Sequence, residues 1–577
     1  MRNPARSALV AAVLSTSLTG VVAVASPGSP APTELAGDQA VSAMVDLETK
    51  MTDSLQVGHA VPVIFDSSAQ LPGHVVAAPY WGDTQLWTGV YVGGESMRYA
   101  LAQHYLDPRG KSAGKGSSDT APGHSQNTLT DEQRAFWTAQ RDQALDRVRT
   151  MVAAQHRDIN IAQDWTGELR VPPAVNPDPG APHTADFGGG VIQGEKGMVT
   201  RGCTPVGLGP LGINPPNHDA ANPINDHSNH VFEITWTHGD GGTYYCETSP
   251  SRDTYAGLTF GLLTAFDMVG PDQPALRAQI RDDILAMASF LVKYGWSYPR
   301  PSGYVGTHSD EDGFLSPLMP HVPMARLNIA NAARHVADAA GTSADRQKWD
   351  AVWDEELASQ GPILGTSMDI DAMMPNQGYF KFNLHHLTGF NLMRTLTGTE
   401  RDVIARGFAV MDKTTRDDIN AHFEAITYAL TGETSRRDAA VTHLMQWLTY
   451  RANTGQGQNI ANSASCSQIG CVPEDQAEFD VEQAPGGSVT WYPGSPDAPP
   501  FSQRAKLRAH RPLPVAQRPP TDFLWQAPPT SLDGQQSPTW REPGIDFLTP
   551  YWMLRYYTEA DAPALMPLPE WVGPAHS

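Results

Sequence analysis

The chain has 577 residues, of which 40% are hydrophobic and 14 are Trp, so it can bury a large core. Its formal net charge is -22 at pH 7, which disfavours nucleic acid and anionic membrane surfaces as partners. The motifs GxSxG, HExxH and GxxxxGK and a dinucleotide fingerprint are absent, so the common esterase, zinc protease and nucleotide-binding functions lose their main support. We expect no cofactor and no bound metal ion.

The first 25 residues are typical of a cleavable secretory signal. Arg2 and Arg6 precede an uncharged stretch rich in Ala, Val and Leu, and small residues follow at 23–25. No later run of about 18 apolar residues suggests a membrane anchor. We therefore predict a signal peptide over 1–25, a flexible leader over 26–55 and one domain over 56–577 that is secreted.

Helical periodicity accounts for most of this domain. The predicted helices cover 84–105, 130–156, 253–269, 273–294, 323–340, 343–359, 379–397, 400–411, 416–430, 435–451 and 550–557. Short links between most of them favour antiparallel neighbours. We expect an all-α fold, an α/α toroid in which helical hairpins form a ring, with a helical solenoid as the alternative.

Two long non-helical stretches interrupt the helices, at about 164–251 and 454–545. Loops of this length are uncommon unless they are functional or disordered. All four cysteines fall within them. In an exported protein they are expected to form two disulfides, and of the three possible pairings we favour Cys203 with Cys246 and Cys466 with Cys471.

The first long helix carries a mixed stripe beside its apolar stripe. Helical spacing puts Trp87, Tyr91, Glu95 and Arg98 on this second face. One interpretation is a solvated ion pair between Glu95 and Arg98 at spacing i,i+3. The other is an inward face that lines a wet cavity, because buried charges need partners.

The segment SRDTYAG begins another helix with a candidate acid. Asp253 lies at the helix start, between Arg252 and Tyr255, and Gly257 and Gly261 on the same face permit close approach of another helix. The alternative interpretation of Asp253 is an ordinary acidic residue stabilised by the helix N-terminus.

A third helix concentrates polar and aromatic side chains on one face. Tyr379, Asn383, His386, Phe390 and Arg394 follow one another at i, i+4, i+7, i+11 and i+15. This face has more hydrogen-bonding groups than a core helix needs, although a lone His is more often structural than catalytic.

Weaker candidates lie near the ends of two other predicted helices. Asn420 and Glu424 have i,i+4 spacing, and Asp546 is expected just before a helix whose first turn holds Pro550.

Several segments resemble a broad group of secreted bacterial helical-toroid proteins. They are WTGVYVGGESMRYAL, YYCETSPSRDTYAGLTFGLLTAFDMV, YFKFNLHHLTGFN, TDFLWQAPPTSLDG and PGIDFLTPYWMLRYY, and the resemblance extends over most of the chain from about Tyr80. More distantly, the architecture is similar to that of toroid glycoside hydrolases and polysaccharide lyases. The resemblance implies the fold, and no catalytic residue is carried over from it.

Aromatic faces and dense hydrogen bonding suit sugar rings, and glycoside cleavage needs two carboxylates or an equivalent acid and base. We therefore expect a glycoside hydrolase acting on an extracellular oligo- or polysaccharide, with Glu95, Asp253 or Asp546 as acid and base. The expected substrate-binding residues are Trp87, Tyr91, Arg98, Arg252, Tyr255, Tyr379 and Asn383.

Two alternatives remain open. In a polysaccharide lyase, Tyr255 or His386 would remove the proton next to a uronate while Asn383 and Arg252 hold its carboxylate. In a non-catalytic glycan or cell-wall binder, the same residues would bind without turnover.

Overall fold

The computed structural model describes residues 35, 37–54, 58–65, 75–77, 84–107, 129–159, 196–205, 233–237, 242–247, 250–296, 322–365, 367–368, 380–453, 540–541 and 543–560. The expected signal peptide, the candidate Tyr379, and Cys466 and Cys471 lie outside the described residues. Among the helices within them, none is long and apolar enough to cross a membrane.

Within the described residues the structure has twelve α-helices, which confirms the all-α prediction. They are α2 (Asp38–Ser54), α3 (Thr84–Leu106), α4 (Asp131–Ile159), α5 (Arg252–Met268), α6 (Pro274–Lys293), α8 (Val322–Ala340), α9 (Ser343–Gln360), α11 (Phe380–Thr395), α12 (Gly398–Thr415), α13 (Ala421–Thr431), α14 (Thr434–Asn453) and α18 (Ile545–Glu559). The 3-10 turns η4 (Gly270–Asp272) and η5 (Gly361–Ile363) follow α5 and α9.

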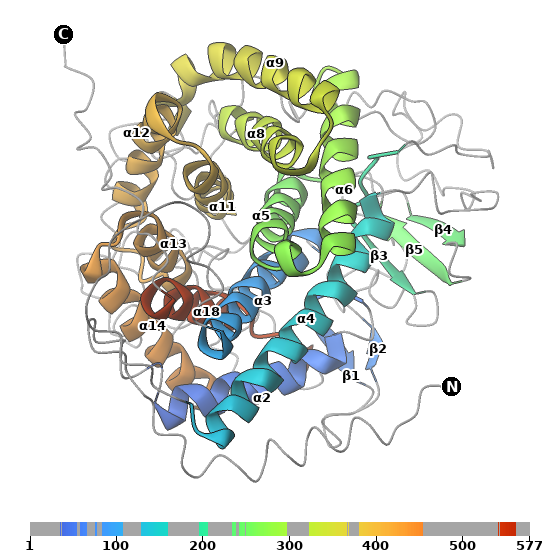
Figure 1. Cartoon of the computed structure of the whole chain (residues 1–577). Coiled ribbons are helices and arrows are strands. Elements are labelled where there is room, and N and C mark those ends of the chain that lie inside the picture. The colour runs from blue at the N-terminus through green and yellow to red at the C-terminus, as the bar shows by residue number, and fades with distance from the viewer. Residues whose placement is uncertain are drawn as a thin grey trace, which may run out of the picture.

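Six helices contact one another in a closed order. Helix α3 packs on α5, α5 on α8, α8 on α11, α11 on α13, α13 on α18, and α18 on α3 again. The others lie outside them: α4 on α3, α6 on α5 and α8, α9 on α8, α12 on α11, α14 on α13, and α2 on α18. Figure 1 shows these two layers, with α3, α5, α8, α11, α13 and α18 inside.

The inner helices run in the same direction. Between α3 and α18, Val90 accepts a hydrogen bond from Thr549, and farther along both helices Tyr105 donates to Glu559. From α3 to α14 each inner helix is followed by its outer partner, whereas α18 pairs with α2 from the other end of the chain. The N-terminal ends of the inner helices therefore gather at one end of the ring. We call their first two turns the N-terminal rim.

Glycines at the crossing of α3 and α5 allow the two helix backbones to approach closely. A Cβ added at Gly89 would lie 1.9 Å from the carbonyl oxygen of Gly257, and one added at Gly261 would lie 2.5 Å from the carbonyl oxygen of Gly89. Because no side chain larger than hydrogen fits these crossings, the predicted role of Gly257 and Gly261 in close approach is confirmed.

Short strands occur where only loops were expected. Strands β3 (Gly202–Pro205), β5 (Thr243–Glu247) and β4 (Glu233–Thr237) form an antiparallel sheet in that order, and Cys203 lies opposite Cys246 in its ladder. A second sheet has the order β2 (Val75–Ala77), β1 (Val63–Phe65) and β6 (Trp540–Arg541). The runs EITWT and TYYCE are rich in β-branched and aromatic residues, which favour strands.

The prediction of a flexible leader over 26–55 was wrong for residues 38–54, which form helix α2. Ala40, Met44 and Met51 are fully buried at helical spacing, and Glu48 is 2% exposed. This buried face stabilises the helix, although the neighbouring Pro and Ala residues suggested a disordered segment.

Two predicted helix starts were also wrong. Residues 416–420 precede α13 as a turn, and Asn420 caps the helix by accepting hydrogen bonds from the backbone of His422 and Phe423. Helix α18 begins at Ile545 and contains Pro550 in its interior, so Asp546 lies within the helix. Burial of Phe547 with its apolar neighbours outweighs the missing N–H group of Pro550.

Candidate functional site

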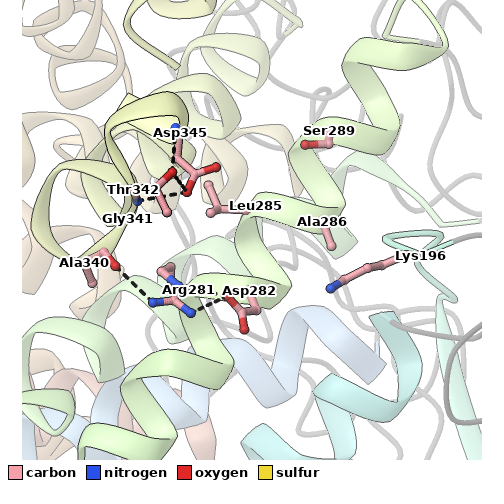
Figure 2. A pocket seen from close by; sticks show the side chains of 10 residues that line it. All are labelled: Lys196, Arg281, Asp282, Leu285, Ala286, Ser289, Ala340, Gly341, Thr342 and Asp345. Atoms are coloured by element: carbon pink, nitrogen blue, oxygen red, sulfur yellow. Dashed lines mark hydrogen bonds and ion pairs between the residues drawn. The ribbon is translucent and has the colours of Figure 1, made fainter. Parts of the chain in front are cut away.

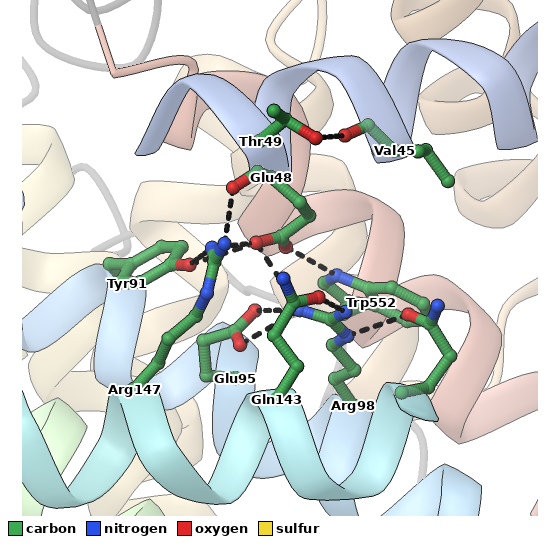
Figure 3. A network of polar contacts seen from close by, with 10 residues as sticks. Val45, Glu48, Thr49, Tyr91, Glu95, Arg98, Gln143, Arg147 and Trp552 are labelled. Carbon is green, nitrogen blue, oxygen red and sulfur yellow. Dashed lines mark hydrogen bonds and ion pairs between the residues drawn. The ribbon is translucent and has the colours of Figure 1, made fainter. Parts of the chain in front are cut away.

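The stripe with Glu95 lies inside the protein. Arg98 Nη1 is 3.0 Å from Glu95 Oε2, and both side chains are fully buried. Figure 3 shows this pair among Glu48 of α2, Arg147 of α4 and Trp552 of α18. The pair is therefore neither solvated nor next to open solvent, because three other helices cover it. Glu95 and Arg98 stabilise the contact between the two helical layers, and we leave them out of the candidate site.

The carboxylate of Asp546 is hydrogen-bonded to the outer layer. It lies in the first turn of α18 and accepts a hydrogen bond of 2.7 Å from Trp447 Nε1 of α14. Glu424 of α13 has a similar arrangement, because its Oε2 is 2.6 Å from Nδ1 of His443 on α14. Both carboxylates therefore belong to the rim but use one oxygen to hold an outer helix.

His386 lies in the wall between α11 and α13. Its Nδ1 is 2.7 Å from the carbonyl oxygen of Phe382, and its ring stacks on Phe423 at a centroid distance of 4.0 Å. Burial lowers the pKa of His386 to about 4, and burial together with His386 lowers the pKa of His422 to about 3. Both imidazoles are therefore neutral at pH 7.

Side chains of α5, α11 and α18 meet toward the axis of the ring. The Phe390 ring of α11 is 5.3 Å from that of Phe260 on α5 and 6.3 Å from that of Tyr557 on α18. Farther along, Arg394 Nη1 lies 2.5 Å from Asp267 Oδ2. Because α11 and α18 are not adjacent in the ring order, Phe390 reaches across its interior. We call these five residues the axial floor.

Asp267 is kept ionised in this floor. Burial alone would raise its pKa, but Arg394 and His335 together lower it to about 2. His335 Nε2 is 2.8 Å from Asp267 Oδ1, so the carboxylate has a partner on α8 as well as on α11. Asp267 therefore links three inner helices, α5, α8 and α11.

Asp253 and Asn383 lie on the rim side of this floor. Asp253 precedes Phe260 by seven residues, and Asn383 precedes Phe390 by seven. A step of seven residues returns to within about 20° of the same helix face. Since Phe260 and Phe390 contact each other, we infer that Asp253 and Asn383 face the same axial space about two turns nearer the rim.

Asp253 and Asn383 both lie near the start of their helices. Asp253 is 9% exposed and follows Ser251, which caps α5 in a capping box with Thr254. Asn383 is fully buried, and within the described part of the chain neither its amide nitrogen nor its amide oxygen has a hydrogen-bond partner. Leaving both groups unpaired costs free energy, which a bound polar ligand would recover.

The rim favours negative charge and holds further polar and aromatic side chains. Its helix N-termini place partial positive charge at this end of the ring. The predicted residues in these first turns are Trp87, Arg252, Asp253, Tyr255, Asn383 and Asp546. Burial raises the pKa of Tyr255 well above its usual range, so this hydroxyl is neutral and can donate a hydrogen bond.

The sequence patterns did not predict Lys381, His385 or His422 as site residues. All three are buried in the first turns of α11 and α13, with exposures of 4%, 1% and 1%. Lys381 and His385 do not lie on the helix face that contains Asn383 and Phe390. The pair of histidines at 385–386, which follows Lys381 by four residues, is the sequence feature that could have pointed to this cluster.

A groove of about 440 Å³ lies on α6 and the turn between α8 and α9, at the opposite end of the ring from the rim. Figure 2 shows Arg281 bonded to Asp282 and to the carbonyl oxygen of Ala340. Asp345 is likewise bonded to Thr342. Because most charged groups of this groove already have partners, we do not assign it the chemistry.

In the part of the chain that the structure describes, no three His, Cys, Asp or Glu side chains are arranged to hold a metal ion. No protein-family model, curated protein or solved structure matches the chain. The resemblance to secreted helical-toroid proteins therefore stays a prediction.

Proposed function

We propose that the chain is a carbohydrate-active enzyme, a glycoside hydrolase that binds its glycan at the N-terminal rim and uses Asp253 as one of its two acid-base groups. One observation carries this proposal. Of the three predicted carboxylates, Asp253 is the one whose helix face leads to the axial floor, on the side where Asn383 has an unpaired amide. Glu95 is paired with Arg98 between the two helical layers, and Asp546 accepts a hydrogen bond from Trp447 of the outer layer.

The chemistry of these side chains suits a sugar. The amide of Asn383 offers a donor and an acceptor to hydroxyl groups, and the indole of Trp87 in the first turn of α3 is a stacking surface. Two carboxyl groups separated by about 5 to 5.5 Å would give a retaining enzyme, and about 6.5 to 9.5 Å an inverting one. Asp546 and Glu424 are the described carboxylates at the rim that can act as the second group.

The test is release of reducing ends from a panel of neutral and acidic polysaccharides by the full chain. We expect one class to be cleaved, and Asp253→Asn to lower kcat about a hundredfold to ten-thousandfold, as loss of an acid-base group does. Asp282→Asn is the matched control, because that side chain is 52% exposed on α6. Equal activity of the Asp253→Asn variant and the unaltered protein would refute the proposal.

A polysaccharide lyase is the second candidate, and the unpaired Asn383 amide together with two neutral imidazoles favours it. Asn383 would bind the uronate carboxylate, and a neutral His can accept a proton. Cleavage by elimination creates a double bond, so new ultraviolet absorbance from an acidic substrate identifies this reaction. Binding without any product would support the third possibility, a glycan or cell-wall binder.

We further infer that the two layers of helices form an α/α toroid and that the chain is exported. The closed contact order of the inner helices supports the toroid, and residues 1–25 support export. We also propose a disulfide between Cys203 and Cys246, because they lie opposite each other in neighbouring strands. Mass spectrometry of the unreduced secreted protein should detect the linked peptides and an N-terminus near Ser26.

A further inference from the structure

Helix α2 is docked by one buried carboxylate. Glu48 Oε2 accepts a hydrogen bond of 2.9 Å from the Tyr91 hydroxyl and lies 3.2 Å from Arg98 Nη1. Arg147 also binds this oxygen, and Trp552 Nε1 donates to Glu48 Oε1 at 3.3 Å. These partners come from α3, α4 and α18, so a single side chain joins α2 to three other helices (Figure 3).

A second carboxyl group, that of Glu95, lies against the first. Glu95 is fully buried, and its Oε2 lies 3.0 Å from Arg98 Nη1, the same nitrogen that lies 3.2 Å from Glu48 Oε2. Two buried carboxyl groups that meet at one nitrogen repel each other when both are ionised, which favours a proton on one of them. Arg98 Nε also donates to Gln140 Oε1 at 2.9 Å, which fixes the guanidinium beside both acids.

We propose that helix α2 is a pH-dependent latch, which is docked while Glu95, beside Glu48, holds a proton and loosens when this proton is lost at alkaline pH. The latch closes the ring, since α2 is the outer partner of α18 and joins the N-terminal part of the chain to the C-terminal part. This inference does not depend on the proposed enzymatic function.

The electrostatics set the pH range. Burial, together with the negative charge of Glu48, raises the pKa of Glu95 to about 8 despite Arg98. Burial alone would raise the pKa of Glu48, but Arg98 and Arg147 lower it to about 2. The proton at neutral pH is therefore held by Glu95, and Glu48 is the anion that binds both guanidinium groups.

These two pKa shifts determine how the stability of the fold depends on pH. Because the folded-state pKa of Glu95 is raised, its contribution to stability is complete below the usual pKa of 4.5 and is lost as pH rises through about 8. The contribution of Glu48 has the opposite sign and is lost as pH falls from 4.5 toward about 2. The latch should therefore be tightest in mildly acidic solution and loosen above pH 8.

The other ionisable side chains around Glu48 and Glu95 do not change the assignment of the proton to Glu95. The ionisable groups that face the pair are Tyr91 and Arg98 from α3 and Arg147 from α4, and burial raises the pKa of Tyr91 well above its usual range. On α18 the nearest ionisable side chains are Tyr551 and Arg555, which are hydrogen-bonded to each other, and Arg555 is also paired with Glu559.

The opposite face of α2 offers a control. Asp46 and Lys50 form an ion pair of 2.6 Å there, with side-chain exposures of 59% and 41%. This pair is in solvent and does not reach the Glu48 carboxylate. Asp46→Asn therefore changes the charge of the same helix without changing the latch.

Hydrogen exchange of the full chain tests the latch. We expect the protection factors of α2 amides, corrected for intrinsic exchange, to fall about tenfold or more between pH 6 and pH 9, while those of α8 and α9 stay constant. Glu95→Gln should abolish the fall, because its amide stays neutral at both pH values. Glu48→Gln should lower protection at both pH values, and Asp46→Asn should behave like the unaltered protein.

Constant protection of α2 across this range, or an equal fall in the Glu95→Gln variant, would overturn the proposal. If that variant fails to fold, infrared spectroscopy of the unaltered protein decides instead. We expect the carbonyl band of a buried protonated carboxyl group at pH 6 and its loss by pH 9. Absence of this band at pH 6 would equally overturn the latch.

Discussion

Two regions of the ring bury polar side chains, and they do so differently. Glu48 binds guanidinium groups of two other helices, and Glu95 binds Arg98 of its own helix. At the rim, Asn383 is equally buried, but neither of its amide atoms has a hydrogen-bond partner among the residues that the structure describes. The comparison shows that a buried polar stripe can hold helices together or remain available for a ligand, and hydrogen-bond partners distinguish the two.

The largest expected effect is on the paired region. Arg147→Met should lower the free energy of unfolding by about 3–5 kcal/mol, because it removes one of the two guanidinium groups that bind the buried Glu48 carboxylate. Urea denaturation of the full chain measures this loss. Arg149→Met on the exposed side of the same helix is the matched control and should cost less than about 0.5 kcal/mol. Equal losses in both variants would mean that the network does not stabilise the fold.

Replacing Asn383 should have the opposite effect on stability to replacing an Asn whose amide is hydrogen-bonded, and this difference tests the comparison. Asn383→Leu should leave stability unchanged or raise it by about 1 kcal/mol, since it removes unpaired buried polar atoms. Asn391→Leu should lower stability by about 1–2 kcal/mol, because Asn328 Oδ1 then loses a donor at 3.2 Å. Thermal unfolding of the two variants side by side checks this, and a matching loss at Asn383 would indicate a structural role.

The smallest expected effect is on the surface of α2. Asp46→Asn should change the free energy of unfolding by less than about 0.5 kcal/mol, because its ion pair with Lys50 is exposed to solvent. Denaturant titration at low and high salt measures it. A loss approaching that of Arg147→Met would mean that α2 is held by its surface charges and not by Glu48.

Much of the fold could be predicted from the sequence, because helical periodicity and capping are local. Thr130, where a helix start was predicted, forms a capping box with Gln133 before α4, with bonds of 3.0 and 3.2 Å. Helix α2 was missed because its partners on α3, α4 and α18 lie far away in the chain. Pro550 suggested a later start for α18, since the burial of Ile545 and Phe547 depends on packing that a single segment does not reveal.

The candidate site was predictable only in part. The stripes correctly grouped Glu95 with Arg98, and Asn383 with Phe390, but spacing cannot show what a side chain meets across the fold. Glu95 shares Arg98 with Glu48, which lies on a helix that was not expected, and the donor to Asp546 is Trp447, 99 residues away. That Asn383 has no partner is a property of the packed structure alone.

The central claim is that Asp253 and Asn383 serve one binding site. A double-mutant cycle on the affinity of the full chain for the glycan that it cleaves or retains tests this most directly, using Asp253→Asn, Asn383→Leu and the combination. We predict a coupling energy of about 1 kcal/mol or more, since both residues would contact the same ligand. Effects that add to within about 0.3 kcal/mol would contradict a shared site.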